Sequence, residues 1–303
     1  MEKDFKLMVA PLQGLTEAAW RSEHFRLFGE RQGEVEYFTP FIRVEKGEVR
    51  ARDLRDFTSV LNQGMNLTPQ IIFRDIEEWK LLVDKLAEAR ATRIDMNMGC
   101  PFPPQVGKGR GVGMLSHPDV VAEIATAMKE YSDSIEFSVK MRLGIKDPEE
   151  ALELVGILNS MPLRHVTIHP RTASQQYKGE LLFDNMAAFT SKLRHSVIFN
   201  GEISTLADIH ALASRYDGVM VGRGLLRHPA LFAEYRGDVE MTAAESGEAW
   251  MELIKATASA LGQRLCGDTQ LRDKMKPYWE YVPDSMDRKT VKLGKKKGIT
   301  WQI

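Results

Sequence analysis

The chain has 303 residues, 43% of them hydrophobic, and its 41 Lys and Arg nearly balance its 42 Asp and Glu. This composition excludes a disordered chain and suits one barrel-sized domain with a small appendage. Two cysteines, Cys100 and Cys266, are too few for a disulfide framework or a zinc site, and we expect no metal. The polar N-terminus and the lack of a long apolar run predict a cytoplasmic protein without a membrane segment.

Short apolar runs alternate with longer amphipathic segments as far as about residue 235. The predicted strands are Leu7–Ala10, Val35–Phe38, Gln70–Phe73, Arg93–Asn97, Phe137–Met141, His165–His169, Val197–Asn200 and Gly218–Val221. The predicted helices between them are Ile76–Ala89, Pro118–Tyr131, Pro148–Asn159 and Thr205–Ser214. Parallel neighbours need crossovers, so the alternation predicts an α/β protein built as a closed (β/α)₈ TIM barrel. Lys46–Gly64 is charged and irregular and carries no predicted element.

The alternation stops near residue 235, which predicts a barrel over residues 1–235 and a small all-helical domain over residues 242–303. A polar linker is expected at Tyr235–Ser246, and helices at Glu248–Leu261 and Thr269–Tyr278. Residues 246–303 contain 11 Lys and Arg against 7 Asp and Glu. The last basic cluster consists of Arg288, Lys289, Lys292, Lys295, Lys296 and Lys297. Such a run is either a solvated tail or a phosphate-binding surface.

The predicted strand Arg93–Asn97 leads into the turn Gly99-Cys100-Pro101. Alternation along the strand places Asp95 and Asn97 on one face. A polar strand end followed by this turn is where an α/β enzyme would carry a proton donor. The alternative, a buried apolar thiol, stays open for Cys100 on this segment alone.

Polar residues also occur at the ends of several other predicted strands, namely Gln70, Lys140, His169 and Asn200. Active sites of such barrels lie at the carboxyl ends of the strands, so these residues predict one shared site with Asn97. The glycine-containing turns Asn200-Gly201-Glu202 and Gly222-Arg223-Gly224 follow the seventh and eighth strands, a frequent phosphate site. A phosphate grip beside inward-facing Lys, Gln and His residues suggests flavin mononucleotide (FMN).

Taken together, these segments resemble the tRNA-dihydrouridine synthase family over roughly residues 7–235. The motifs that carry the resemblance are Ala10-Pro11-Leu12, Gln70, Asp95-Met96-Asn97-Met98-Gly99-Cys100-Pro101, Val139-Lys140-Met141-Arg142, His169-Pro170-Arg171-Thr172, Asn200-Gly201-Glu202-Ile203 and Gly222-Arg223-Gly224. The resemblance implies an FMN enzyme that uses NADPH to reduce a D-loop uridine of tRNA. Hydride would pass from flavin N5 to uracil C6 and a proton from Cys100 to C5.

The resemblance also assigns roles to residues by position. The implied cofactor-binding residues are Pro11, Leu12, Gln70, Lys140, His169, Asn200, Gly201, Glu202, Gly222 and Arg223. Gln70 would bond the reactive edge of the flavin, and Gly222 with Arg223 would hold its phosphate. Asn97, Arg171 and Tyr177 would bind the substrate. Glu202 stands where the family more often has aspartate, and Pro170 replaces a smaller residue.

The glycine-rich segment Phe102–Met114 is either a lid over the base or a flexible loop. Two other functions remain open at the sequence level. One is an FMN-dependent oxidoreductase acting on a free pyrimidine, of the dihydroorotate or dihydropyrimidine dehydrogenase type, and the basic helical appendage disfavours it. The other is a tRNA-binding protein without turnover, which the complete set of polar strand ends disfavours. We expect a monomer, with a local basic patch that binds tRNA.

Overall fold

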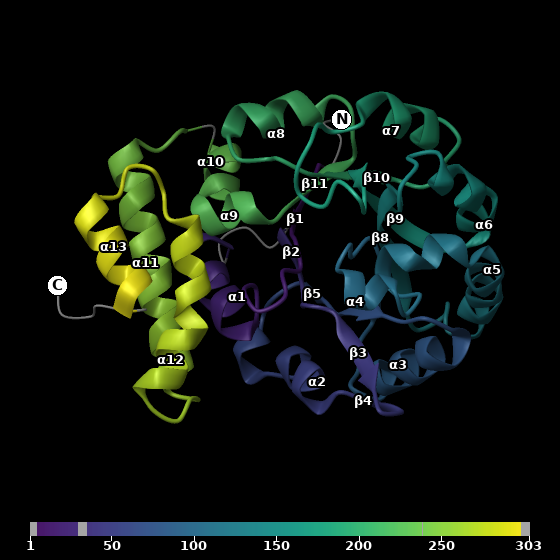
Figure 1. Cartoon of the computed structure of the whole chain (residues 1–303), viewed down its shortest axis with the longest axis horizontal. Coiled ribbons are helices and arrows are strands. Elements are labelled where there is room, and N and C mark those ends of the chain that lie inside the picture. Colours follow the sequence, from purple (N-terminus) through teal and green to yellow (C-terminus); the bar gives the residue numbers. More distant parts are fainter. Residues whose placement is uncertain (1–4, 30–34, 238, 298–303) are drawn as a thin grey trace.

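The computed structural model describes residues 5–29, 35–237 and 239–297, and Figure 1 shows their arrangement. The strands are β1 (Lys6–Val9), β2 (Val35–Phe38), β3 (Ile42–Glu45), β4 (Glu48–Val49), β5 (Leu67–Thr68), β6 (Gln70–Ile72), β7 (Arg93–Met98), β8 (Glu136–Gly144), β9 (Leu163–Thr172), β10 (Val197–Asn200) and β11 (Gly218–Val221). The α-helices are α1 (Ala18–His24), α2 (Ala51–Phe57), α3 (Ile76–Glu88), α4 (Pro103–Val106), α5 (Pro118–Ala127), α6 (Val155–Ser160), α7 (Phe183–Thr190), α8 (Leu206–Ala213), α9 (Arg223–Arg227), α10 (Leu231–Gly237), α11 (Ala243–Gly262), α12 (Asp268–Met275) and α13 (Arg288–Lys297).

The parallel sheet closes on itself through a strand that Pro69 divides into β5 and β6. β5 pairs with β2, whereas β6 pairs with β7. The remaining parallel pairs run from β7 through β8, β9, β10 and β11 to β1, and from β1 back to β2. Pro69 has no N–H to give, but its carbonyl accepts from the N–H of Asp95 and keeps the two halves in one ladder. The predicted (β/α)₈ barrel is confirmed.

The segment without a predicted element contains a β-hairpin and a short helix. β3 and β4 pair in antiparallel fashion, and β3 also pairs with β6 through Ile42 and Ile71. α2 follows directly. The strands are short and charged on their outer side, which leaves no period-2 pattern long enough to read.

The helices follow the predicted pattern with shifted boundaries. α3 begins at the residue after Asp75, whose carboxylate accepts the N–H of Glu78 as an N-cap. The segment predicted as a helix at Pro148–Asn159 starts as a 3-10 helix at Glu150–Leu154 and continues as α6. α11 begins at Ala243, earlier than expected, because Thr242 and Glu245 form a capping box. The linker expected at Tyr235–Ser246 is shorter than predicted, because α10 extends to Gly237 and α11 already begins at Ala243.

The C-terminal helices α11, α12 and α13 lie together on one side of the barrel, beside α1 and α9 (Figure 1). The fully buried Trp250 of α11 donates its indole N–H to the Leu226 carbonyl of α9 at 2.9 Å. The hydroxyl of Tyr278 donates to the Leu15 carbonyl, and Lys274 pairs with Glu17 at 2.6 Å. These contacts hold the helical unit against α9 and against the loop that follows β1.

α13 presents one basic face to solvent. Gly294 is buried against the ring of Trp279, where a β-carbon would collide with the indole, so the helix packs closely on that side. The exposed residues on the other side are Arg288, Lys289, Lys292, Lys295 and Lys296, called here the basic face. At the helical spacing they fall within an arc of about 120°. The cluster is therefore a helix surface and not a structureless tail.

We expect Trp250→Ala to lower the free energy of unfolding by roughly 3–5 kcal/mol, because it leaves a cavity between α11 and the barrel. Trp250→Phe keeps most of the ring and removes the N–H donor, and should cost about 1 kcal/mol. Denaturant unfolding measures both, with the exposed Val239→Ala as a control of small effect. Equal losses for Trp250→Ala and Val239→Ala would contradict this docking.

Candidate active site

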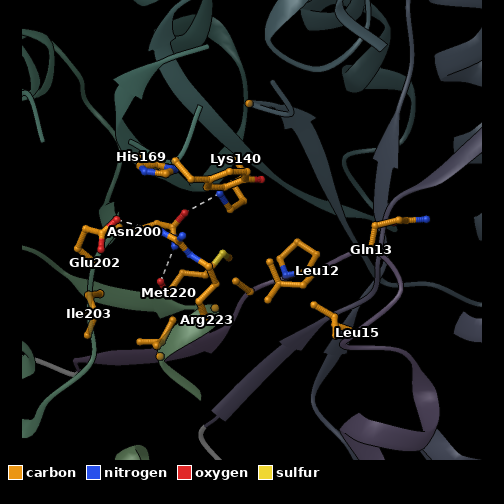
Figure 2. A pocket seen from close by; sticks show the side chains of 18 of the residues that line it. Leu12, Gln13, Leu15, Lys140, His169, Asn200, Glu202, Ile203, Met220 and Arg223 are labelled. Carbon is orange, nitrogen blue, oxygen red and sulfur yellow. Dashed lines mark hydrogen bonds and ion pairs between the residues drawn. The ribbon is translucent and has the colours of Figure 1, made fainter. Parts of the chain in front are cut away.

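A cavity of about 850 Å³ opens at the carboxyl ends of the barrel strands. Figure 2 shows part of its wall, with Leu12 and Leu15 on one side and His169, Asn200 and Glu202 on the other. The predicted site residues that line it are Pro11, Leu12, Asn97, Cys100, Lys140, His169, Tyr177, Asn200, Gly201, Glu202, Gly222 and Arg223. The structure thus brings together residues that the sequence spreads over more than two hundred positions.

Lys140 and Asn200 form a fixed pair on the cavity wall. The Lys140 ammonium donates to Asn200 Oδ1 at 2.7 Å, and Asn200 Nδ2 donates to the Met220 carbonyl at 2.7 Å (Figure 2). Burial, reinforced by the nearby Arg142 charge, lowers the pKa of Lys140 to about 8. Lys140 is therefore still positively charged at neutral pH, but its pKa lies only slightly above that pH.

His169 stands beside this pair and is uncharged at neutral pH. Its burial, together with the charges of Arg142 and Lys140, holds its pKa far below the ordinary value. Arg171 approaches its Nε2 at 3.5 Å. A neutral imidazole in this position offers one N–H donor and one acceptor, but no charge.

Cys100 follows β7 and faces the same cavity with its proton in place. Burial raises the pKa of its thiol, so the thiol stays protonated at neutral pH. The Cys100 backbone is fixed from two sides: its N–H donates to Asn97 Oδ1 at 2.9 Å, and its carbonyl accepts from the N–H of Val112 at 3.2 Å. Gly111 has a φ of 61°, and a β-carbon there would lie 2.7 Å from the Cys100 carbonyl oxygen.

The two glycine-containing turns lie side by side. Gly224 packs so closely on the Ile203 carbonyl that a β-carbon would collide with it. A β-carbon on Gly222 would meet Ala10 at 3.3 Å, so the bare backbone borders the cavity beside the turn after β1. Only glycine lets these backbones come together in this way.

Glu202 binds two arginines at the rim of the cavity. Its Oε1 lies 2.7 Å from Arg171 and 3.0 Å from Arg223, and the pair lowers its pKa, the Arg171 hydrogen bond being the main cause. Glu202 has a φ of 49°, a strained value for a residue with a β-carbon. Tyr177, half-exposed, lies between the guanidinium groups of Arg142 at 5.3 Å and Arg223 at 5.0 Å.

Gln70 and Arg171 lie behind the cavity wall. Gln70 has 0% exposed surface, and its side-chain amide is bonded to Asp95 and Asn97. Arg171 is buried, and its guanidinium bonds the Gly179 carbonyl as well as Glu202. Neither side chain is among the residues that line the cavity.

The segment 102–114 is anchored over its second half. Arg110 is buried and pairs with Glu78 at 2.5 Å, and Val112–Leu115 are buried in the core. Its first half is the short helix α4, preceded by Phe102 with 57% of its surface exposed. The exposed positions of the segment are 102–104 and 107–108.

Two kinds of wall residue had not been predicted. One is Arg142, which stands two positions after Lys140 on β8. Strand alternation puts the two side chains on the same face and could have identified Arg142. Glu280, Tyr281 and Asp284 come from the segment between α12 and α13 and also line the cavity. Sequence pattern gives no signal for these three, because only the docking of the helical unit brings them to the barrel.

The architecture has counterparts among solved structures. Morphinone reductase matches with a TM-score of 0.51 at 10% identity, over 78% of this chain and 87% of that protein. The old yellow enzyme from Trypanosoma cruzi matches with a TM-score of 0.51 at 10% identity, over 78% of this chain and 89% of that one. At this identity the likeness shows the shared barrel fold.

Sequence relatives are more specific. tRNA-dihydrouridine synthase B of Pasteurella multocida is 29% identical over 233 residues, 75% of this chain and 68% of that protein. A probable tRNA-dihydrouridine synthase of Helicobacter pylori strain J99 is 33% identical over 148 residues, which span 48% of this chain and 45% of that protein.

The closed barrel and the cavity at the carboxyl ends of its strands define a protein of the (β/α)₈ barrel class. Residues 8–296 match the family described as dihydrouridine synthase (Dus). The chain belongs to this family.

Membrane-spanning helices and clustered metal ligands are both absent from the described residues 5–29, 35–237 and 239–297. Within these ranges no helix is long and apolar enough to cross a membrane. Within the same ranges no group of three or more His, Cys, Asp or Glu side chains is arranged to hold a metal ion.

The lowered pKa of Lys140 predicts a pH effect on stability. Between about pH 8 and pH 10.5 the unfolded chain holds this proton more tightly than the folded protein, so the contribution of Lys140 to stability increases as pH rises through this window. We expect the free energy of unfolding of the cofactor-free wild type, relative to Lys140→Met, to increase over the same window. Urea unfolding at several pH values measures the difference. A difference that is constant with pH would show that the ammonium is not desolvated.

Proposed function

We propose that this protein is a tRNA-dihydrouridine synthase that binds FMN in the barrel cavity, takes electrons from NADPH, and reduces the C5=C6 bond of a D-loop uridine. The observation that carries the proposal is the position of Cys100. A protonated thiol lies on the wall of the same cavity as the Lys140–Asn200 pair and the two glycine turns. A reducing site and a proton donor therefore share one space.

The residues present fit FMN. The cavity volume of about 850 Å³ falls within the usual range for cofactor sites. Bare backbone at Gly222 and Gly224, with Arg223 beside them, suits a phosphate group. Leu12 and Pro11 offer an apolar surface to a flat ring, and Lys140 offers a cation to its electron-rich edge. When bound, the flavin supplies hydride to carbon C6 of the uracil.

Cys100 supplies the matching proton. Hydride addition at C6 leaves negative charge that develops toward C5, and a thiol whose pKa is raised by burial still holds a proton to meet it. Lys140 and Arg142 lie near enough to favour the resulting thiolate, since both charges lower the pKa of Cys100 against the effect of burial. The thiol can then regain its proton from water.

Asn97 and Tyr177 are proposed to bind the uracil. Asn97 stands on the cavity wall three residues before Cys100, so a base held by its side chain lies close to the thiol. Tyr177 presents a half-exposed ring at the rim. Arg171 acts on the site through Glu202, which it holds together with Arg223. A base must leave its stack to enter, and an aromatic ring at the entrance lowers that cost.

We further propose that residues 1–235 form the catalytic barrel and residues 242–303 a tRNA-binding unit of a monomeric cytoplasmic enzyme. Support comes from the basic face of α13, which gives a near-neutral protein a local site for phosphates. A free pyrimidine would need no such face. Tyr281 of the same unit lines the cavity, which supports a tRNA-binding role for the helices near the proposed flavin site.

Cys100→Ala should keep FMN and tRNA binding and lose most dihydrouridine formation, on the order of a hundredfold or more, because general acid catalysis is removed. Flavin absorbance, tRNA binding and dihydrouridine content measure the three properties. Cys266→Ser is the matched control, since this thiol is exposed and outside the cavity, and it should retain full activity. Normal turnover by Cys100→Ala would remove this thiol as the acid. A colourless protein that refuses added FMN would remove the cofactor assignment.

Replacing Lys292, Lys295 and Lys296 by Gln should weaken tRNA binding and reduce the slope of log affinity against log salt by about 0.7–0.9 for each phosphate that the protein no longer neutralises. Flavin content should not change, because these three lysines face solvent and are not among the residues that line the cavity. The matched control replaces Lys80, Lys85 and Lys129, which belong to the helical segments around the barrel. Equal affinity and equal slope for the two triple variants would return the basic face to an ordinary solvated surface.

A further inference from the structure

A row of buried polar side chains lies directly behind Cys100. Ser138 Oγ donates to Asp95 Oδ1 at 2.6 Å, and Gln70 Nε2 donates to Asp95 Oδ2 at 2.7 Å. Asn97 Nδ2 then donates to Gln70 Oε1 at 2.8 Å. Asn97 Oδ1 accepts the backbone N–H groups of Gly99 at 3.1 Å and Cys100 at 2.9 Å. We call Asp95, Gln70 and Asn97 the amide relay.

The direction of every hydrogen bond in the amide relay follows from the carboxylate at its inner end. An ionised carboxylate only accepts, so the NH₂ of Gln70 must face Asp95 and its carbonyl oxygen must face Asn97. The NH₂ of Asn97 must then face Gln70, and its side-chain oxygen must face the backbone N–H of Cys100. Asp95 is ionised at neutral pH, because burial raises its pKa only to about 6.

Burial makes this orientation costly to reverse. Asp95 and Gln70 have no exposed surface, and Asn97 has 8%. The Gln70 backbone is also fixed, since its N–H donates to Thr39 Oγ1 at 3.1 Å. A flipped Gln70 would set its oxygen against the carboxylate and its NH₂ against that of Asn97, which would leave buried polar groups without hydrogen bonds.

The orientation has a consequence at the cavity. The oxygen of Asn97 is used by the Cys100 loop, so what Asn97 shows to the cavity is its second N–H. An N–H donor selects a ligand with an acceptor oxygen at that position, such as a uracil carbonyl. The same side chain also fixes the position of the Cys100 backbone through the hydrogen bonds that its oxygen accepts.

We propose that Asp95 and Gln70 are positioning residues that act through Asn97: they fix which end of its amide faces the cavity, and thereby hold Cys100 and the substrate carbonyl in one geometry. This inference rests on the proposed function for its substrate, and on the hydrogen bonds alone for its structural part.

The test introduces charge repulsion into the relay and then removes it. Gln70→Glu places a second carboxylate 2.7 Å from Asp95, and the two share one proton while pH is low enough. Other charged groups near Asp95 are Lys140 on β8 and Glu36 on β2, and both stay in every variant. The double variant Asp95→Asn with Gln70→Glu keeps the total charge and restores each donor–acceptor pair, with the carboxylate moved to position 70.

Two measurements report the result. Hydrogen exchange of the Gly99 and Cys100 amides should be at least tenfold faster in Gln70→Glu than in wild type at about pH 9, and within twofold at about pH 6, where the shared proton is bound. Dihydrouridine formation should lose kcat by about a hundredfold at the higher pH, with KM for tRNA and flavin content within twofold. The double variant should match wild type in both at both pH values.

Ser138→Ala is the matched control, because it removes one hydrogen bond from Asp95 without changing the direction of the relay. Losing this bond raises the pKa of Asp95, so the control is compared at about pH 9, where Asp95 stays ionised and the exchange of the Gly99 and Cys100 amides and kcat should match wild type. The inference is wrong if Gln70→Glu exchanges like wild type at the higher pH, if the double variant shares its defect, or if the double variant does not fold. If wild type forms no dihydrouridine, the proposed function fails while the exchange measurement still decides the relay.

Discussion

Closure of the parallel barrel is the constraint on which the rest of this structure depends. Because all the barrel strands run the same way, their carboxyl ends meet on one rim, and residues as distant as Leu12 and Arg223 become neighbours there. The ring is completed at Pro69, where a missing N–H divides one strand and its carbonyl still joins the ladder. An open sheet of the same strands would separate the glycine turns from Cys100.

The cavity wall carries Lys140, Arg142, Arg223 and Arg227 together with the carboxylates Glu202, Glu280 and Asp284. Glu202 pairs with Arg223 and Asp284 with Arg227, whereas Lys140 and Arg142 donate to the neutral oxygens of Asn200 and Thr172. Burial is the main cause of the neutral His169 and of the lowered pKa of Lys140, and the neighbouring cations add to it. The electrostatic pattern suits an electron-rich, anionic cofactor and an anionic transition state.

The helical unit is part of this site as well as an addition to it. Trp250 and Tyr278 fasten it to the loops after β11 and β1, and Tyr281 then reaches the cavity wall. The same unit carries the basic face of α13, so its docking on the barrel relates this face to the cavity. Membership of the dihydrouridine synthase family gives this coupling an evident use: a base attached to a large RNA must arrive at a recessed position.

The sequence by itself determined the barrel class, the order of its strands and most of the cavity wall, because strand alternation and strand-end polarity are local patterns. Cys100, Lys140 and Asn200 were found in this way. Only the tertiary structure shows the partners of Gln70, which are Asp95 and Asn97, and those of Arg171, which are Gly179 and Glu202. It also decided that Tyr281 lines the cavity and that Asp95 accepts hydrogen bonds from Ser138 and Gln70. These depend on register between strands and on docking of a distant helix, and no spacing along one segment encodes which partner a side chain meets across a closed sheet.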